Sequence, residues 1–198
     1  QKWSAGVYIS SSNRVEVKNL TVRNIYVQRS ASDMAGEFTN GIYFSGNIAG
    51  IKIHNNTISA ARIGVRGSFV TATWTGNIDI YNNTISDTCW NINLGAGGDI
   101  TGTTVGASVN IYGNDLSDWS NWNKDINFYH TDGIILFRGT DGNGPLFSVS
   151  IYNNYIHGAL GNPAGTGFVF CSTQTACTIF NNLLVMETPS GTAIYFHG

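Results

Sequence analysis

The sequence predicts an all-β protein, a right-handed single-stranded parallel β-helix in which about six coils stack along one axis. Three observations predict this fold. One strand–bend–strand phrase recurs six times, a second apolar phrase lies between its copies, and asparagine recurs at the bend. Self-similarity at a period of about 20 to 50 residues is typical of solenoids, in which each repeat packs only on its neighbours. We therefore expect equivalent residues to lie above one another.

The first phrase alternates apolar and polar residues, continues through an asparagine bend and ends on another apolar residue, as in Ile-Lys-Ile-His-Asn-Asn-Thr-Ile. Its copies occupy residues 15–22, 51–58, 78–85, 109–116, 149–156 and 177–184. Alternation with a period of two indicates a strand with one buried face. Each copy is therefore predicted to form a strand, a bend and a second strand.

The second phrase supplies a third strand for each coil. Its copies occupy residues 41–44, 62–65, 91–94, 133–136, 167–170 and 193–196. Aligning these copies by their first residues places Arg62, Asn91 and Gly133 in one outward column, with Asp132 one step before it. An antiparallel sandwich would explain the alternation, but not one phrase that returns in register.

Asparagine suits the bend because it tolerates a left-handed backbone, and its amide can donate to one neighbouring coil and accept from the other. We therefore expect an internal asparagine ladder. The two asparagines of the phrase form two columns, and which of them faces inward stays open. The longest coil runs from Asn114 to Asn154, so it is predicted to carry an inserted loop at about 117–132.

Composition excludes several classes of protein. Only 11% of the residues are charged, and the net charge of -2 comes without a basic cluster, so no nucleic-acid partner is expected. No apolar run approaches the roughly 18 residues that a membrane span requires, so no membrane insertion is expected. The length fits a single domain over residues 1–198.

Both ends of the chain lie within strand phrases. We therefore expect a segment of a longer protein, uncapped at both ends and able to associate end to end or as a trimer. Cys171 and Cys177 are spaced for a loop disulfide, although buried thiols explain the spacing as well. A disulfide would indicate a secreted or cell-surface protein.

The whole chain resembles the pectate-lyase-like superfamily through its repeated I-x-I-x-N-N-x-I coils. That superfamily contains polysaccharide lyases, polygalacturonases and phage tailspikes, so the resemblance implies an extracellular protein that acts on or binds acidic polysaccharide. His130-Thr131-Asp132-Gly133 is similar to the Asn-Thr-Asp-Gly motif of polygalacturonases. On that match, Asp132 alone would take an acid/base role. The later Asp-Asp, Gly-His-Gly and Arg-Ile-Lys motifs of polygalacturonases do not follow here.

The inserted loop and the strand after it hold the candidate catalytic residues. A glycosidase needs two carboxylates across the scissile bond, and a lyase needs a base together with a cation that neutralises the uronate carboxylate. The catalytic candidates are His130, Asp132, Arg138 and Asp125. His130 and Asp132 could instead hydrogen-bond the turn that begins the strand.

Substrate-binding candidates lie along the outward face of the third-strand sheet and in the inserted loop. They are Arg62, Arg66, Asn91, Asn93, Trp119 and Trp122. The tryptophans could stack on sugar rings or cover the loop, and the arginines could instead be solvated or ladder-paired. No tightly bound metal or cofactor is expected, because the aspartates are not aligned as a calcium site requires; calcium stays open as the alternative.

Two classes of function remain open. The first is an enzyme, a lyase or glycoside hydrolase of acidic polysaccharide, and the loop rich in Trp, Asp and His favours it. The second is a non-catalytic module, a tailspike-like glycan binder, an adhesin or a filament-forming solenoid. The absence of the paired-acid motif favours this second class.

Overall fold

The computed structural model describes residues 4–25, 39–68, 73–95, 105–119, 131–137, 148–159, 167–172, 176–187 and 192–197. These residues form strands and bends, with no helix among them. The described part of the chain therefore contains no helix that could cross a membrane. All strand pairs in these ranges are parallel, so the prediction of an all-β, parallel protein is confirmed.

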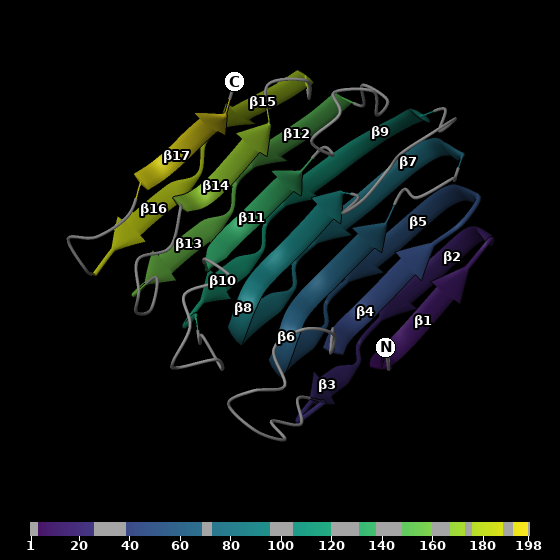
Figure 1. Cartoon of the computed structure of the whole chain (residues 1–198), viewed down its shortest axis with the longest axis horizontal. Helices are drawn as coiled ribbons and strands as arrows, with labels where there is room; N and C mark the ends of the chain where they lie inside the picture. Colours follow the sequence, from purple (N-terminus) through teal and green to yellow (C-terminus); the bar gives the residue numbers. More distant parts are fainter. Residues whose placement is uncertain are drawn as a thin grey trace.

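The first strand of every phrase lies in one six-stranded sheet (Figure 1). The strands of this sheet are β2 (Asn13–Lys18), β5 (Ile48–His54), β7 (Trp74–Tyr81), β9 (Val105–Tyr112), β12 (Ser148–Tyr152) and β15 (Ala176–Phe180). They pair in chain order, so Ile51 lies opposite Ile78 and Ile78 lies opposite Val109. Equivalent residues of successive phrases are thus neighbours, as the repeat predicts.

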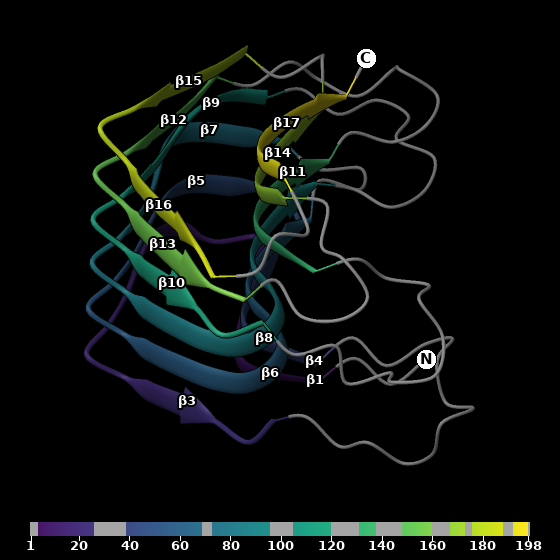
Figure 2. The same cartoon turned by 90° about the vertical axis from the view of Figure 1, so that its left-hand side faces the viewer.

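The remaining strands form an eleven-stranded sheet. They are β1 (Ser4–Ser10), β3 (Thr21–Arg23), β4 (Thr39–Ser45), β6 (Thr57–Ser68), β8 (Thr84–Gly95), β10 (Asp115–Ser117), β11 (Asp132–Phe137), β13 (Tyr155–Gly158), β14 (Gly167–Ser172), β16 (Leu183–Met186) and β17 (Thr192–His197). In β6 and β8 the predicted second and third strands are continuous, with Ala60 and Asp87 at positive φ between them. Figure 2 shows the eleven-stranded sheet curving around the space that the six-stranded sheet faces.

The apolar residues of both sheets meet in one core. In the coil that begins with β5, the side chains of Ile51, Ile53, Ile58 and Val65 are fully buried. Burying such a side chain stabilises the fold by about 1.5 to 3 kcal/mol. The alternation in the phrases therefore identified the inward residues, while Lys52 between them is exposed.

The second asparagine of the phrase faces inward in the second to fifth copies, whereas the first copy has the exposed Leu20 at this place. Asn56, Asn83, Asn114 and Asn154 are at most 2% exposed. The Nδ2 of each donates to the Oδ1 of the next at 2.9–3.0 Å, and Asn182 continues the row. These bonds satisfy amide groups that stacking buries.

The first asparagine of the phrase has a conformational role. Asn55 and Asn82 are exposed and adopt φ of +54° and +53°. Gly113 occupies the same place in the fourth copy, with φ +63°. Asparagine and glycine visit this left-handed region at little cost, so the bend selects them.

One predicted register is wrong by two residues. Arg62 does not share a column with Asn91 and Gly133, because it is Gly64 that lies level with Asn91. The core sets this register, since the buried Val65 pairs with isoleucines of both neighbouring coils.

Candidate functional site

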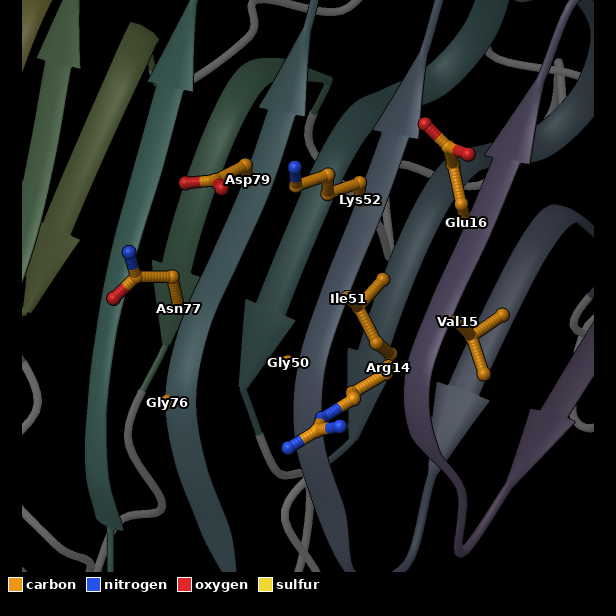
Figure 3. A pocket seen from close by; sticks show the side chains of 9 residues that line it. All are labelled: Arg14, Val15, Glu16, Gly50, Ile51, Lys52, Gly76, Asn77 and Asp79. Atoms are coloured by element: carbon orange, nitrogen blue, oxygen red, sulfur yellow. The ribbon is translucent and has the colours of Figure 1, made fainter.

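A hollow of about 690 Å³ lies against the strands β2, β5 and β7 of the six-stranded sheet (Figure 3). Its volume is in the range of small-molecule and cofactor sites. The lining residues are Arg14, Val15, Glu16, Gly50, Ile51, Lys52, Gly76, Asn77 and Asp79. The hollow therefore brings together residues from three successive coils.

Glycine and a backbone irregularity shape this hollow. Gly50 and Gly76 adopt φ of +79° and +72°, and the register between β5 and β7 shifts between Ala49 and Ile51, as at a β-bulge. Bulges bend a strand and redirect its side chains. Because neither glycine carries a side chain, the sheet surface is left open at this point.

Arg14 has the same unusual backbone as these two glycines. Its φ is +55°, and its flanking residues pair with those of Gly50, so the two lie level on neighbouring strands. An L-residue in the left-handed region costs about 1 to 2 kcal/mol, and such positions cluster at functional sites. The fold thus holds a cationic side chain where the next coils carry glycine.

Charges of alternating sign cross the hollow. Glu16 pairs with Lys52 and Lys52 with Asp79 in the sheet register. All three residues alternate with buried or partly buried apolar residues and therefore point outward. Neighbouring strands are about 4.8 Å apart, so the ammonium group of Lys52 is placed between two carboxylate-bearing strands.

Both carboxylates already have partners within the sheet. Glu16 contacts His54 Nε2 through Oε1 at 2.9 Å and accepts from Lys18 Nζ through Oε2 at 3.0 Å. These bonds, that of His54 first, lower the pKa of Glu16. Asp79 Oδ1 accepts from Asn110 Nδ2 at 2.8 Å. The two acids therefore have hydrogen-bond donors without any ligand.

The two cations differ from the acids in this respect. Within the described ranges, no hydrogen bond or ion pair joins the side chain of Arg14 or of Lys52 to another residue. Figure 3 shows the guanidinium group of Arg14 extending from β2 toward β5, and the Lys52 side chain lying between Glu16 and Asp79. The donors of both cations are therefore available to an anionic ligand.

A stack of aromatic rings runs along the sheet beside the hollow. It comprises His54, Tyr81, Tyr112, Tyr152 and Phe180, with ring centroids 4.5 to 4.9 Å apart and interplanar angles of 1 to 5°. The ring faces that cover one another within the stack are not open to a sugar ring. The stack instead fixes His54, which holds Glu16 in place at the edge of the hollow.

The acid of the His-Thr-Asp-Gly motif lies elsewhere. Asp132 is fully buried, and its Oδ1 accepts from the backbone N–H of Gly167 at 3.0 Å. Its backbone carbonyl accepts from Nε1 of Trp119 at 2.8 Å, and Trp119, 5% exposed, stacks on Phe168. Asp132 and Trp119 are therefore in contact, but in the interior.

Four further binding candidates are buried in β6 and β8. The guanidinium groups of Arg62 and Arg66 lie over the rings of Trp90 and Tyr43, at 5.9 and 5.7 Å. Burial lowers the pKa of Arg66 to about 10. The two remaining candidates are Asn91 and Asn93.

Asn91 and Asn93 both have partners within the eleven-stranded sheet. Asn91 donates to Thr88 Oγ1 at 3.0 Å, and Asn93 pairs with Arg66 in the register of β6 and β8. None of the four lines the hollow. The remaining predicted site residues lie outside the described part of the chain. They are His130, Asp125, Arg138 and Trp122.

Sequence reasoning missed the hollow, although a signal was present. Aligning the phrases one residue further toward the amino terminus places Arg14 beside Gly50, and the outward positions read Glu16, Lys52 and Asp79.

In the described ranges, no three His, Cys, Asp or Glu side chains are grouped to hold a metal ion. Comparison of the chain with protein-family models, curated proteins and solved structures finds no match.

Proposed function

We propose that the chain is a right-handed, single-stranded parallel β-helix of about six coils and that the hollow binds an acidic polysaccharide. Parallel pairing, the in-register phrases and the bonded inner asparagines support the fold. The polymer would be extracellular, so we also propose that the protein is secreted or displayed at a cell surface.

The observation that carries this function is the contrast between cations and acids in the hollow. The carboxylates of Glu16 and Asp79 have hydrogen-bond partners within the sheet, whereas the side chains of Arg14 and Lys52 have none in the described ranges. Charge-assisted bonds from Arg and Lys to carboxylate or sulfate are among the strong ones, and Arg can make two in parallel. The hollow therefore favours a ligand with negative groups.

A polymer suits this surface better than a small anion does. The outward row of Glu16, Lys52 and Asp79 continues as Asn110, Ser150 and Thr178 on the next three strands. Six strands at a spacing of about 4.8 Å give a polar row of roughly 24 Å. A sugar chain along the stack would meet a hydrogen-bonding side chain at each strand.

Binding is a better match than hydrolysis to these residues. A glycosidase needs one carboxylic acid that is protonated at working pH, which requires a raised pKa. The pKa of Glu16 is instead lowered. A lyase needs a cation at the uronate carboxylate, so a lyase is the second candidate, with Arg14 and Lys52 neutralising that carboxylate and with His130 as the candidate base for the α-proton.

The test is calorimetric titration of the protein with a galacturonate oligosaccharide and with a neutral glucose oligosaccharide at low salt. We expect binding of the acidic oligomer alone. Each charge-assisted bond contributes about 1.5 to 3 kcal/mol, so Arg14→Ala and Lys52→Ala should each weaken binding by about tenfold or more. Arg23→Ala removes an exposed cation outside the hollow and is the matched control.

Equal affinity for the neutral oligomer, or an equal loss in Arg23→Ala, would contradict the proposal. Absorbance near 235 nm from unsaturated sugar ends would identify a lyase. If it disappears in Lys52→Ala, the hollow carries the reaction. If it persists there, catalysis belongs to other residues, of which His130, Asp125 and Arg138 remain predictions.

A further inference from the structure

We infer that Cys171 and Cys177 are a modification site, a thiol pair that oxidises to a disulfide linking β14 to β15, while Cys89 stays reduced. The two Sγ atoms lie 2.7 Å apart, without a bond between them. An S–S bond measures about 2.05 Å, so a small movement of the side chains suffices to form it. This inference is independent of the proposed polysaccharide binding.

The position of the pair determines what the bond would join. Cys171 lies in the eleven-stranded sheet and Cys177 in the six-stranded sheet. Cys171 is fully buried in the core, and the partly buried Cys177 packs against that core. The disulfide would therefore fasten one coil to the next through the interior.

The environment of the two sulfur atoms favours a defined order of events. The two thiols are hydrogen-bonded to each other, and because either sulfur can be the donor, this bond stabilises whichever of them is the thiolate. Cys177 is the more exposed of the two. The thiolate is the attacking species in thiol–disulfide exchange, so Cys177 reacts first.

The oxidant is a low-molecular-weight disulfide such as oxidised glutathione. The Cys177 thiolate attacks one sulfur of this reagent, forms a mixed disulfide and releases one thiolate. Cys171 then loses its proton, attacks the Cys177 sulfur and displaces the second thiolate. The protein loses two electrons and two protons in total, and the reagent is reduced to two thiols.

Cys89 provides an internal control. It is 3% exposed in β8, and burial raises the pKa of its thiol to about 12. It is therefore protonated at neutral pH and unreactive toward disulfides. Trypsin separates the sites, because residues 67–124 hold Cys89 and residues 139–198 hold the other two cysteines without an internal Lys or Arg.

In the experiment, the full chain is treated with oxidised glutathione, alkylated in denaturant and digested with trypsin. The masses of the peptides are then measured by mass spectrometry. We expect peptide 139–198 to be unalkylated and lighter by two hydrogen atoms, and to take two alkyl groups after reduction. Peptide 67–124 should be alkylated in both cases. A non-reducing gel should show a monomer, which places the bond within one chain.

Two variants sharpen the test. Cys89→Ser should leave the bond intact, and Cys171→Ser should accumulate glutathione on Cys177, with circular dichroism reporting whether each variant folds. Two alkyl groups on peptide 139–198 after oxidation, or a bond to Cys89, would overturn the inference. The wild-type masses decide this even if a variant fails to fold.

Discussion

Replacing Asn83 with alanine should destabilise the protein by about 4 kcal/mol. The Asn83 side chain makes four hydrogen bonds, donating to Ile53 O and Asn114 Oδ1 and accepting from both the backbone N–H and the Nδ2 of Asn56. Each contributes about 1 kcal/mol net. Asn83 is only 1% exposed, so water does not replace the lost partners.

Urea unfolding followed by tryptophan fluorescence measures this change. At a slope of about 2 kcal/mol per M, the midpoint should fall by about 2 M. Asn82→Gly is the matched control, because Asn82 is exposed with φ +53° and glycine already stands at the equivalent Gly113. It should change the free energy of unfolding by less than about 1 kcal/mol. The reasoning is refuted if Asn83→Ala costs no more than Asn82→Gly.

Further predictions concern packing and pH. A Cβ at Gly64 would collide with Ile85 and with a backbone carbonyl of the next coil, so Gly64→Ala should destabilise by about 1 to 3 kcal/mol. A Cβ at Gly106 meets nothing within 4 Å, so Gly106→Ala should be nearly neutral in the same urea assay, and equal effects would contradict this packing. Because the pKa of Glu16 is lowered, its contribution to stability is present above its ordinary value of 4.5 and is lost as the pH falls through the lower folded-state value. His54→Phe should raise that pKa in a carboxyl NMR titration, and an unchanged titration would show that the His54 contact has no such effect.

The sequence predicted the strands well because their signal is local. Each Ile-x-Ile alternation states which residues face inward, and the asparagine bend needs a left-handed backbone that few residues accept. The inward column was not predictable, since Asn55 and Asn56 are chemically identical. Only the structure shows that the second one reaches the amides of neighbouring coils.

The register and the hollow depend on contacts between coils. Ile63 and Val65 are two residues apart and therefore face the same side of the strand. The sequence alone did not reveal which of them lies opposite Ile42. The hollow requires a bulge at Gly50, with Arg14 level with it on the preceding strand. The repeated phrases place Arg14 and Gly50 at equivalent positions. They do not predict the backbone conformation that opens the sheet surface there.

A crystal structure of the protein with a bound galacturonate oligosaccharide tests the central claim most directly. We predict right-handed coils stacked in the observed register, with a ligand carboxylate about 3 Å from the donors of Arg14 and Lys52. An oligosaccharide bound elsewhere while this hollow stays empty would contradict the proposed function. Left-handed coils, or strands in another order, would contradict the fold on which it rests.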